Sequence, residues 1–487
     1  MAHRHAMTSA DAAWLHMDRP TNLMVINSIL WFDEPLDWAA VQDVFRERVA
    51  DHFPRFRQRV VERGPGQGPA WEDDPGFDEA LHFHRLALPA PGDRAVLQEV
   101  VSDLIAAPLD RTKPLWHVYL LEAFGPGCAL LVRMHHCIAD GIALGRVMLS
   151  LTDSDGQPGG FAPDATERSP HGPLAPVSAL AGPLLRAAGV GGAAAATVVH
   201  EGMESLAHPR HAAHLARVAA DDARTLAKLL LPAAERPSAL KGEQRAAHRV
   251  AWAEPVSLRT VKATGHALGA TVNDVLVSAV AGAVGRHLAA AGARPDELHA
   301  MVPFNLRPAD EPLPRELGNR FGLVLLELPV GTEDPVERLA VVRDQMLAIK
   351  DSHEGALSYG ILGLAGRAPA RVEELLVDFF SAKATMVLTN VPGPRRPVAL
   401  AGTPVQGVLV WAPCSGSVGM SVSVFSYAGH VTAGFLTDAG LVAAPQGLAD
   451  DFRREVLGLR RRVREIARAP PSPSSSKPSG HDRRTAC

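Results

Sequence analysis

The chain has few cysteines and no long apolar run. Its four cysteines show no Cys-x-x-Cys spacing, which favours a reducing compartment and argues against a cysteine-based zinc site. No stretch reaches the roughly 18 apolar residues of a spanning helix, and the closest segment, Ala187–Val199, predicts at most a surface or interfacial helix. The first seven residues lack the apolar core of a signal peptide. We therefore expect a cytoplasmic protein.

Positive charge is not in excess. The sequence contains 49 Lys and Arg against 53 Asp and Glu, with a net charge of −4 and a pI near 6.6. Domains that bind nucleic acids are usually strongly basic, so we expect no nucleic-acid partner.

Two common hydrolase signatures are also missing. No Gly-x-Ser-x-Gly elbow occurs, and the nearest segment, Ser415–Gly419, lacks the first glycine. The pairs His200-Glu201 and His353-Glu354 lack the second histidine of a zinc hydrolase. The sequence therefore argues against a serine hydrolase and a zinc hydrolase, and we expect no metal site.

Apolar periodicity divides the chain into two mixed α+β halves, residues 8–152 and 241–469. Residues 153–240 between them predict a loop followed by a helical linker, and the Pro- and Ser-rich residues 470–487 predict a disordered tail. We see no repeat relating the halves. A single site shared between them is therefore expected, since clefts between domains commonly bind ligands.

Two apolar runs in the first half predict a β-hairpin. They are Leu115–Glu122 and Cys128–Met134, and the Gly-Pro-Gly between them marks a turn. In the second half we expect a helix that begins at Asn273 with Thr271 as its cap, and a long helix at Gln446–Ala469.

The segment Met134–Gly141, Met-His-His-Cys-Ile-Ala-Asp-Gly, is the most informative in the chain. It follows the second strand of the hairpin and precedes a stretch with helical spacing. Adjacent strand residues face opposite ways, so only one histidine can point into a given cavity. An imidazole exchanges protons near neutral pH, and one imidazole presented by a short turn suits a general base.

This octapeptide resembles the His-His-x-x-x-Asp-Gly motif of the coenzyme-A-dependent acyltransferase superfamily. Further segments resemble its bacterial wax ester synthase/diacylglycerol acyltransferase family. They are Ser9–Met17, Pro108–Arg111 with Pro114–Trp116, Leu268–Val275, Pro303–Arg307 with Gly318–Arg320, and Thr389–Pro394.

The resemblance implies a fold and a reaction. The fold is a pseudo-dimer of two chloramphenicol-acetyltransferase-like lobes with the active site in a tunnel between them. The reaction is transfer of an acyl group from acyl-coenzyme A to diacylglycerol or a long-chain alcohol, giving triacylglycerol or wax ester. Acyl-coenzyme A is a substrate here, and no cofactor is expected.

The resemblance also implies roles for individual residues. His136 is the general base, and His135 supports it from the opposite face. Asp140 is architectural and pairs with an arginine, for which Arg307 is the candidate, while Gly141 permits close backbone approach. Cys137 is structural.

Other residues lie further along the chain. Asn273 is either the donor to the oxyanion or a helix-capping residue, and Asp274 caps or orients. Trp116 packs beneath the hairpin or contacts substrate, and Asn390 shapes the tunnel wall or a turn.

Some alternatives remain open. A condensation-type enzyme would take its acyl group from a carrier protein, and a lipid-binding protein would not turn substrate over. The seven arginines between Arg453 and Arg468 form either a solvated helix face or a contact with anionic lipid head groups or coenzyme A phosphates. Contact with a membrane or lipid droplet would follow from the second interpretation.

Overall fold

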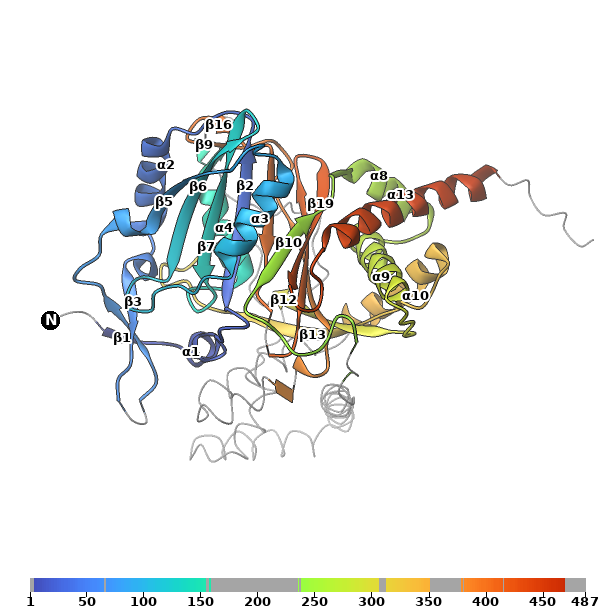
Figure 1. Ribbon diagram of the computed structural model, residues 1–487, viewed down its shortest axis with the longest axis horizontal. Coiled ribbons are helices and arrows are strands. Elements are labelled where there is room, and N and C mark those ends of the chain that lie inside the picture. Colours follow the sequence, from blue (N-terminus) through green and yellow to red (C-terminus); the bar gives the residue numbers. More distant parts are fainter. Residues whose placement is uncertain are drawn as a thin grey trace, which may run out of the picture.

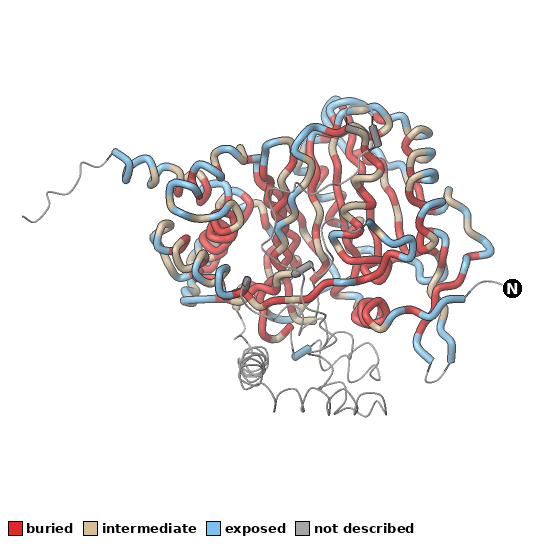
Figure 2. The backbone as a smooth tube through the Cα atoms, turned by 180° about the vertical axis from the view of Figure 1, so that it is seen from behind, coloured by how far each residue is buried: buried red, intermediate tan, exposed pale blue. Residues whose placement is uncertain are grey.

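Two large β-sheets lie side by side, with most helices on their outer sides and the helices of residues 94–105 and 141–150 near the centre of the molecule (Figure 1). The computed structural model describes residues 4–64, 67–154, 157–158, 235, 238–305, 312–350, 378–379, 381–414 and 416–468. Buried positions are concentrated in the strands of both sheets (Figure 2). The predicted mixed α+β class is therefore confirmed.

The N-terminal sheet has the strand order β17-β2-β7-β6-β5. In β6 and β7, Trp116 lies opposite Met134 in an antiparallel pair, which confirms the predicted hairpin. Every residue of β7 is buried, as expected for a continuous apolar run. The strands are β2 (Val25–Phe32), β5 (Phe83–Ala87), β6 (Trp116–Phe124), β7 (Gly127–His135) and β17 (Gly407–Trp411), and the nearby helices are α1 (Ser9–His16), α2 (Trp38–Phe45), α3 (Arg94–Ile105) and α4 (Gly141–Ser150).

The C-terminal sheet has the order β10-β19-β18-β14-β12-β13, and β11 also pairs with β19. Its strands are β10 (His248–Trp252), β11 (Val256–Ser257), β12 (Leu298–Asn305), β13 (Phe321–Leu328), β14 (Met386–Pro392), β18 (Met420–Tyr427) and β19 (His430–Asp438). Four helices gather beside it (Figure 1): α8 (Leu258–Ala267), α9 (Val272–Ala290), α10 (Pro335–Lys350) and α13 (Gln446–Arg468).

The start of α9 is held by a capping box. The Asp274 amide donates to Thr271 Oγ1 at 3.2 Å, and the Thr271 amide donates to Asp274 Oδ2 at 2.8 Å. Two amides that the helix itself leaves without partners are thereby satisfied. The predicted cap at Thr271 is confirmed.

Segments from the second half of the chain complete sheets of the first half. Strand β17 pairs with β2, with Leu409 opposite Ile29. Strand β15 (Ala399–Leu400) likewise pairs with β8 (Thr152–Ser154). The predicted division at residues 8–152 and 241–469 does not anticipate this crossover, because a short apolar run carries no sign of which sheet it joins. The crossover ties the two halves together.

The smaller strands lie outside the two large sheets. They are β1 (Arg4–Ala6), β3 (Gln58–Val61), β4 (Ala70–Asp73), β9 (Gln157–Pro158) and β16 (Thr403–Pro404). Within the described residues, no single helix is long and apolar enough to cross a membrane, while the pair α8 and α9, bent by 97°, meets both criteria only when taken together.

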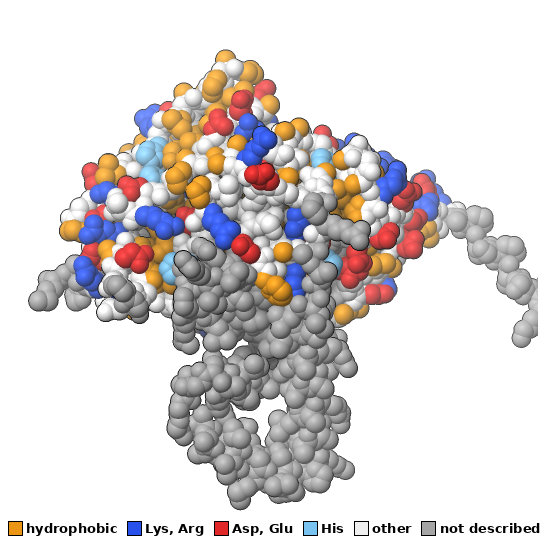
Figure 3. Space-filling model, turned by 60° about the horizontal axis from the view of Figure 1, so that its bottom comes forward, with side chains coloured by type: hydrophobic (Ala, Val, Ile, Leu, Met, Phe, Trp, Pro, Cys, Tyr) orange, Lys and Arg blue, Asp and Glu red, His pale blue; other side chains and the backbone are white. Residues whose placement is uncertain are grey.

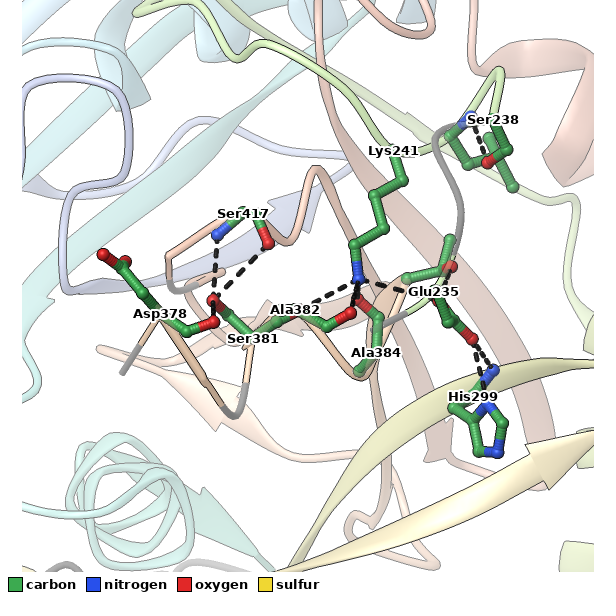
Figure 4. A network of polar contacts seen from close by, with 11 residues as sticks. Glu235, Ser238, Lys241, His299, Asp378, Ser381, Ala382, Ala384 and Ser417 are labelled. Carbon is green, nitrogen blue, oxygen red and sulfur yellow. Dashed lines mark hydrogen bonds and ion pairs between the residues drawn. The ribbon is translucent and has the colours of Figure 1, made fainter. Parts of the chain in front are cut away.

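A buried lysine joins the segment before β14 to Glu235, which in turn contacts β12 (Figure 4). Lys241 Nζ donates to the carbonyls of Ser381, Ala382 and Ala384 at 3.0, 2.5 and 2.7 Å. It also lies 3.7 Å from Glu235 Oε2. The other Glu235 oxygen accepts the backbone N–H of His299 at 2.6 Å. The network fixes the turn from which β14 starts.

Candidate active site

The octapeptide forms the predicted strand-to-helix junction. His135 is the last residue of β7, and α4 begins at Gly141. The His136 amide donates to the Met24 carbonyl at 2.7 Å, which fixes the backbone beside β2. Asp140 is the N-cap of α4, and its Oδ1 accepts the Ala143 amide at 2.8 Å. This short turn holds the His136 ring in place.

The imidazole of His136 is enclosed by aromatic rings. Trp14 stacks on it with ring centroids 4.0 Å apart, and Phe321 lies 5.4 Å away. The residue is only 5% exposed. Burial lowers the pKa of His136 to about 4, because the charged form loses its hydration. The imidazole is therefore neutral at neutral pH, as a general base requires.

Asn319 contacts one ring nitrogen of His136, and the residue's own backbone also forms a hydrogen bond with the ring. His136 Nδ1 lies 3.0 Å from Asn319 Oδ1. An amide oxygen only accepts hydrogen bonds, so Nδ1 must be the protonated nitrogen. Nε2 then holds the lone pair, and it has no hydrogen-bond partner among the described residues. Nε2 is thus the ring nitrogen that is able to accept a proton.

Sequence reasoning missed the role of Asn319. The segment Gly318–Arg320 resembles the family, but this resemblance assigns no function to its asparagine. Asn319 lies 183 residues from His136 in the chain, so no local pattern links the two. The only local signal of a special backbone position is the glycine that precedes Asn319. Gly318 has a φ of 99°, a backbone angle that residues other than glycine rarely adopt.

Asp140 links the turn to the other half of the chain. While its Oδ1 caps α4, its Oδ2 accepts the Arg320 amide at 3.1 Å. Nearby, the Gly318 amide donates to the Ile138 carbonyl at 3.2 Å. Asp140 therefore joins the turn to the backbone of Arg320, and its architectural role stays a prediction. Its predicted partner Arg307 lies outside the described residues, so that pairing stays a prediction.

Gly141 is not tightly enclosed by the protein. A Cβ added there would meet only Ile26 Cδ1, at 3.9 Å. No part of the described protein makes the predicted close approach to its backbone. A role for Gly141 toward a bound substrate stays a prediction.

His135 has a different set of partners from His136. Its Nδ1 accepts the Cys137 amide at 3.1 Å, and its Nε2 lies 3.7 Å from Asp18 Oδ2. Burial opposes the charge on Asp18, but the contacts with His135, the Met24 amide and Arg111 outweigh it and lower the pKa of Asp18. His135 therefore bonds locally, to Cys137 and near Asp18, and its supporting role stays a prediction.

Asn273 and Asn390 are brought together by the fold. Asn390 Nδ2 donates to Asn273 Oδ1 at 2.8 Å, joining β14 to the start of α9. This leaves the Asn273 Nδ2 group as a donor, which suits its predicted role toward an oxyanion. The neighbouring Asp274 is used by the capping box.

Trp116 lies wholly inside the N-terminal half. It is 0% exposed, stacks on Phe45 at 4.6 Å and on His82 at 4.3 Å, and donates from Nε1 to the Phe56 carbonyl at 2.9 Å. Among its two predicted roles, these contacts favour packing beneath the hairpin over contact with substrate.

An apolar cavity lies between the two sheets beside α4. Its walls come from α4, from β2 and β17 of the N-terminal sheet, and from β14 and β18 of the C-terminal sheet. The lining residues include Leu30, Ile142, Gly145, Val410 and Phe425. The helix that Asp140 caps thus forms one wall of this apolar space. Within the described residues, no group of three or more His, Cys, Asp or Glu side chains is placed to hold a metal ion.

Sequence comparison identifies the family of both halves. The model of the wax ester synthase/diacylglycerol acyltransferase catalytic domain matches residues 7–276, and the model of the family's C-terminal domain matches residues 317–459. A probable diacylglycerol O-acyltransferase of Mycobacterium tuberculosis is 31% identical over 474 residues, which cover 94% of this chain and 96% of the relative. A second, putative one from that organism is 27% identical over 432 residues, covering 86% and 88%.

Solved structures show the same fold. The wax ester synthase/diacylglycerol acyltransferase of Marinobacter aquaeolei VT8 is similar with a TM-score of 0.64 at 21% identity, covering 94% of this chain and all of that one. The first condensation domain of the calcium-dependent antibiotic synthetase is similar with a TM-score of 0.56 at 18% identity, covering 95% and 96%. These likenesses confirm the predicted superfamily fold.

Proposed function

The chain belongs to the wax ester synthase/diacylglycerol acyltransferase family, and from that membership we propose the reaction of its site. A fatty acyl group passes from acyl-coenzyme A to the hydroxyl of diacylglycerol or a long-chain alcohol. The products are a triacylglycerol or wax ester and free coenzyme A. The observation that carries the proposal is the neutral imidazole of His136, whose Nδ1 is occupied by Asn319 and whose Nε2 is left to accept a proton.

The transfer proceeds in two steps. Nε2 of His136 takes the hydroxyl proton as the alcohol oxygen attacks the thioester carbonyl, giving a tetrahedral oxyanion. We assign the donor to that oxyanion to the Asn273 side-chain amide, on its resemblance to the family's motif. The carbon–sulfur bond then breaks, and the protonated imidazole returns the proton to the coenzyme A thiolate. The imidazole of His136 is then neutral again and ready for the next cycle.

Direct attack is favoured over an acyl-enzyme. The only thiol in the octapeptide is Cys137, and burial raises its pKa well above the usual range. A thiolate is the nucleophilic form of cysteine, so this thiol is unreactive. Cys137 is also 0% exposed. The oxygen of the acceptor alcohol is therefore the nucleophile.

The apolar cavity beside α4 is the proposed place for the acyl chain. Burying a methylene group contributes about 0.8 kcal/mol, so an apolar wall favours long chains. The cavity's walls include Ile142 and Gly145, in the helix that Asp140 caps. A chain held there would have its thioester near the His136 turn.

The projecting end of α13 is the proposed contact with a lipid surface. This helix extends beyond the rest of the described chain (Figure 1). Arg461, Arg464 and Arg468 are exposed, share one helix face by spacing, and have no ion pair among the described residues. Acidic side chains also lie at this end (Figure 3), and Glu465 and Asp334 pair with Arg462. Anionic head groups fit the three unpaired arginines.

Sedimentation with lipid vesicles tests this contact. Changing Arg461, Arg464 and Arg468 to Gln should abolish binding to phosphatidylglycerol-containing vesicles, since each arginine near such a surface contributes about 1 kcal/mol. A matched control changes Arg57, Arg59 and Arg63 to Gln, which alters net charge equally at the other end of the molecule. Equal loss in both variants, or no loss in the first, would contradict the assignment.

Thiol release from palmitoyl-coenzyme A tests the reaction itself. The purified protein is given hexadecanol or dipalmitoylglycerol, and the ester is identified by mass spectrometry. Release that depends on an acceptor, with one ester formed per thiol, is the expected result. Ester formation only from palmitoyl-carrier protein would favour the condensation-type alternative, and lipid binding without any ester would favour a binding protein.

A further inference from the structure

Behind Asn319 lies a buried carboxylate whose contacts lead from one half of the chain to the other. Asp11, in α1, is 0% exposed. Its Oδ1 accepts the Asn319 amide at 3.0 Å and Asn319 Nδ2 at 2.9 Å. Its Oδ2 accepts from Arg55 at 3.3 Å. Arg55 is buried too and stacks over Trp71 at 4.5 Å. Charged groups enclosed this deeply are costly unless paired, so the arrangement calls for an explanation.

Asp11 fixes the orientation of the Asn319 side chain. Asn319 Nδ2 donates both to Asp11 Oδ1 and to the His136 carbonyl, the latter at 2.8 Å. Both partners only accept hydrogen bonds. Turning the amide over would place its oxygen against two other oxygens, those of Asp11 and of the His136 carbonyl. The Asn319 oxygen therefore faces His136 Nδ1, and it can only accept a hydrogen bond there.

We propose that Asp11 and Asn319 are positioning residues that set the tautomer of His136. Asp11 holds the amide, the amide oxygen accepts Nδ1–H, and the lone pair is thereby assigned to Nε2. Neither residue needs to touch substrate. Because Asp11 and His136 come from the first half of the chain and Asn319 from the second, the base has its working tautomer only when the two halves are docked. This inference rests on the proposed function of His136.

Asp11→Asn should change the tautomer of His136. An asparagine at position 11 has nearly the same size, and its NH2 group can donate to a turned Asn319 oxygen, so that only the His136 carbonyl and the Asn319 backbone amide still oppose the turn. In the turned amide Asn319 Nδ2 faces His136 Nδ1, which must become the acceptor, and the proton moves to Nε2. The variant also leaves Arg55 without its carboxylate partner, which lowers stability, so kcat is compared for the folded protein, whose base is in the wrong tautomer. Loss of the correct histidine tautomer in a serine-protease triad lowers kcat by about 10⁴-fold, which sets the scale.

The test combines kinetics with a direct view of the ring. We expect Asp11→Asn to lose roughly 10²- to 10⁴-fold in kcat with little change in KM. Nitrogen-15 NMR of histidine-labelled protein should show His136 protonated at Nδ1 in wild type and at Nε2 in the variant. The double variant Asp11→Asn with Asn319→Asp exchanges carboxylate and amide, restores an acceptor at Nδ1, and should recover part of kcat.

A matched control removes a similar asparagine that does not touch His136. Asn22 is 3% exposed and also joins the two halves, with Nδ2 donating to Gln244 Oε1 at 2.9 Å and to the Gly416 carbonyl at 3.0 Å. Asn22→Leu should lose stability yet keep the tautomer and kcat of the folded protein, whereas Asn319→Leu should lose both. An Asp11→Asn protein with wild-type kcat and Nδ1–H would overturn the inference. So would a folded double variant no more active than Asp11→Asn.

The two proposals fail in different ways. If His136→Ala keeps its activity, the proposed role of His136 is wrong, whatever Asp11 does. If His136→Ala is inactive while Asp11→Asn keeps wild-type kcat, only the tautomer inference is wrong.

Discussion

The indole of Trp14 lies almost parallel to the imidazole of His136, with 4.0 Å between centroids and 16° between planes. Trp14 belongs to α1, which also carries Asp11. One face of the ring is thus covered by the same short helix that orients its Nδ1 proton through Asn319. The low polarity on that face is a direct cause of the burial that keeps His136 neutral.

Removing the indole should make His136 easier to protonate. Trp14→Ala admits water, so we expect the pKa of His136 to rise toward its ordinary value of about 6.5. The acid limb of kcat/KM should move up accordingly, and the lost aromatic packing should cost about 3–5 kcal/mol of stability. Trp14→Phe keeps a ring and should show a smaller shift. If the acid limb of kcat/KM were unchanged in folded Trp14→Ala, the indole would not be what lowers the pKa of His136.

The wild-type pH profile follows from the same burial. Because His136 has a pKa of about 4 and acts in its neutral form, kcat/KM should stay constant as pH falls from about 8 to about 5.5 and drop only below that. The unfolded chain binds this proton at about 6.5, so His136 also makes the fold less stable as pH falls from there toward 4. If kcat/KM of the wild type instead fell with an apparent pKa of about 6.5, the base would not be enclosed as described.

Filling the cavity should change the preferred acyl chain. An added Cβ at Gly145 meets nothing within 4 Å, and this residue lines the cavity. Gly145→Leu is compatible with its helix, where glycine is the weaker helix former by about 1 kcal/mol. We expect the preference among acyl-coenzyme A donors to shift from palmitoyl to octanoyl. Gly447→Leu, at a helical glycine with equally open surroundings in α13, is the control and should leave the preference unchanged.

The lysine network should contribute to stability. Lys241→Met leaves three backbone carbonyls and Glu235 without the Nζ donor. Breaking a buried charge pair in this way costs about 3–5 kcal/mol. Urea unfolding measures the loss, with Lys262→Met, at an exposed lysine of α8, as the control. Equal stability of the two variants would show that the network contributes little.

Local features of the fold were predictable from the sequence. The hairpin ending at His135 is marked by two apolar runs and a Gly-Pro-Gly turn, and α4 by Asp140 at its start. The Thr271 cap is likewise a signal within four residues. Each depends on neighbours in the chain, where hydrophobic spacing and capping chemistry act.

Long-range features were not predictable in this way. Strand β17 is five residues long, and its pairing with β2 depends on which sheet edge is open in three dimensions. The contact between Asn319 and Asp11 spans 308 residues. Such contacts form between side chains whose individual positions carry no mark of a partner, and only the folded arrangement brings them together.

The most direct test of the account is ester formation by His136→Ala. The rate of acceptor-dependent thiol release from palmitoyl-coenzyme A is compared with wild type and with His430→Ala, at an exposed histidine of the β18–β19 turn. A general base contributes about 10²- to 10⁴-fold, so His136→Ala should lose at least 10²-fold in kcat while His430→Ala keeps wild-type activity. A folded His136→Ala protein with wild-type kcat would contradict the central claim.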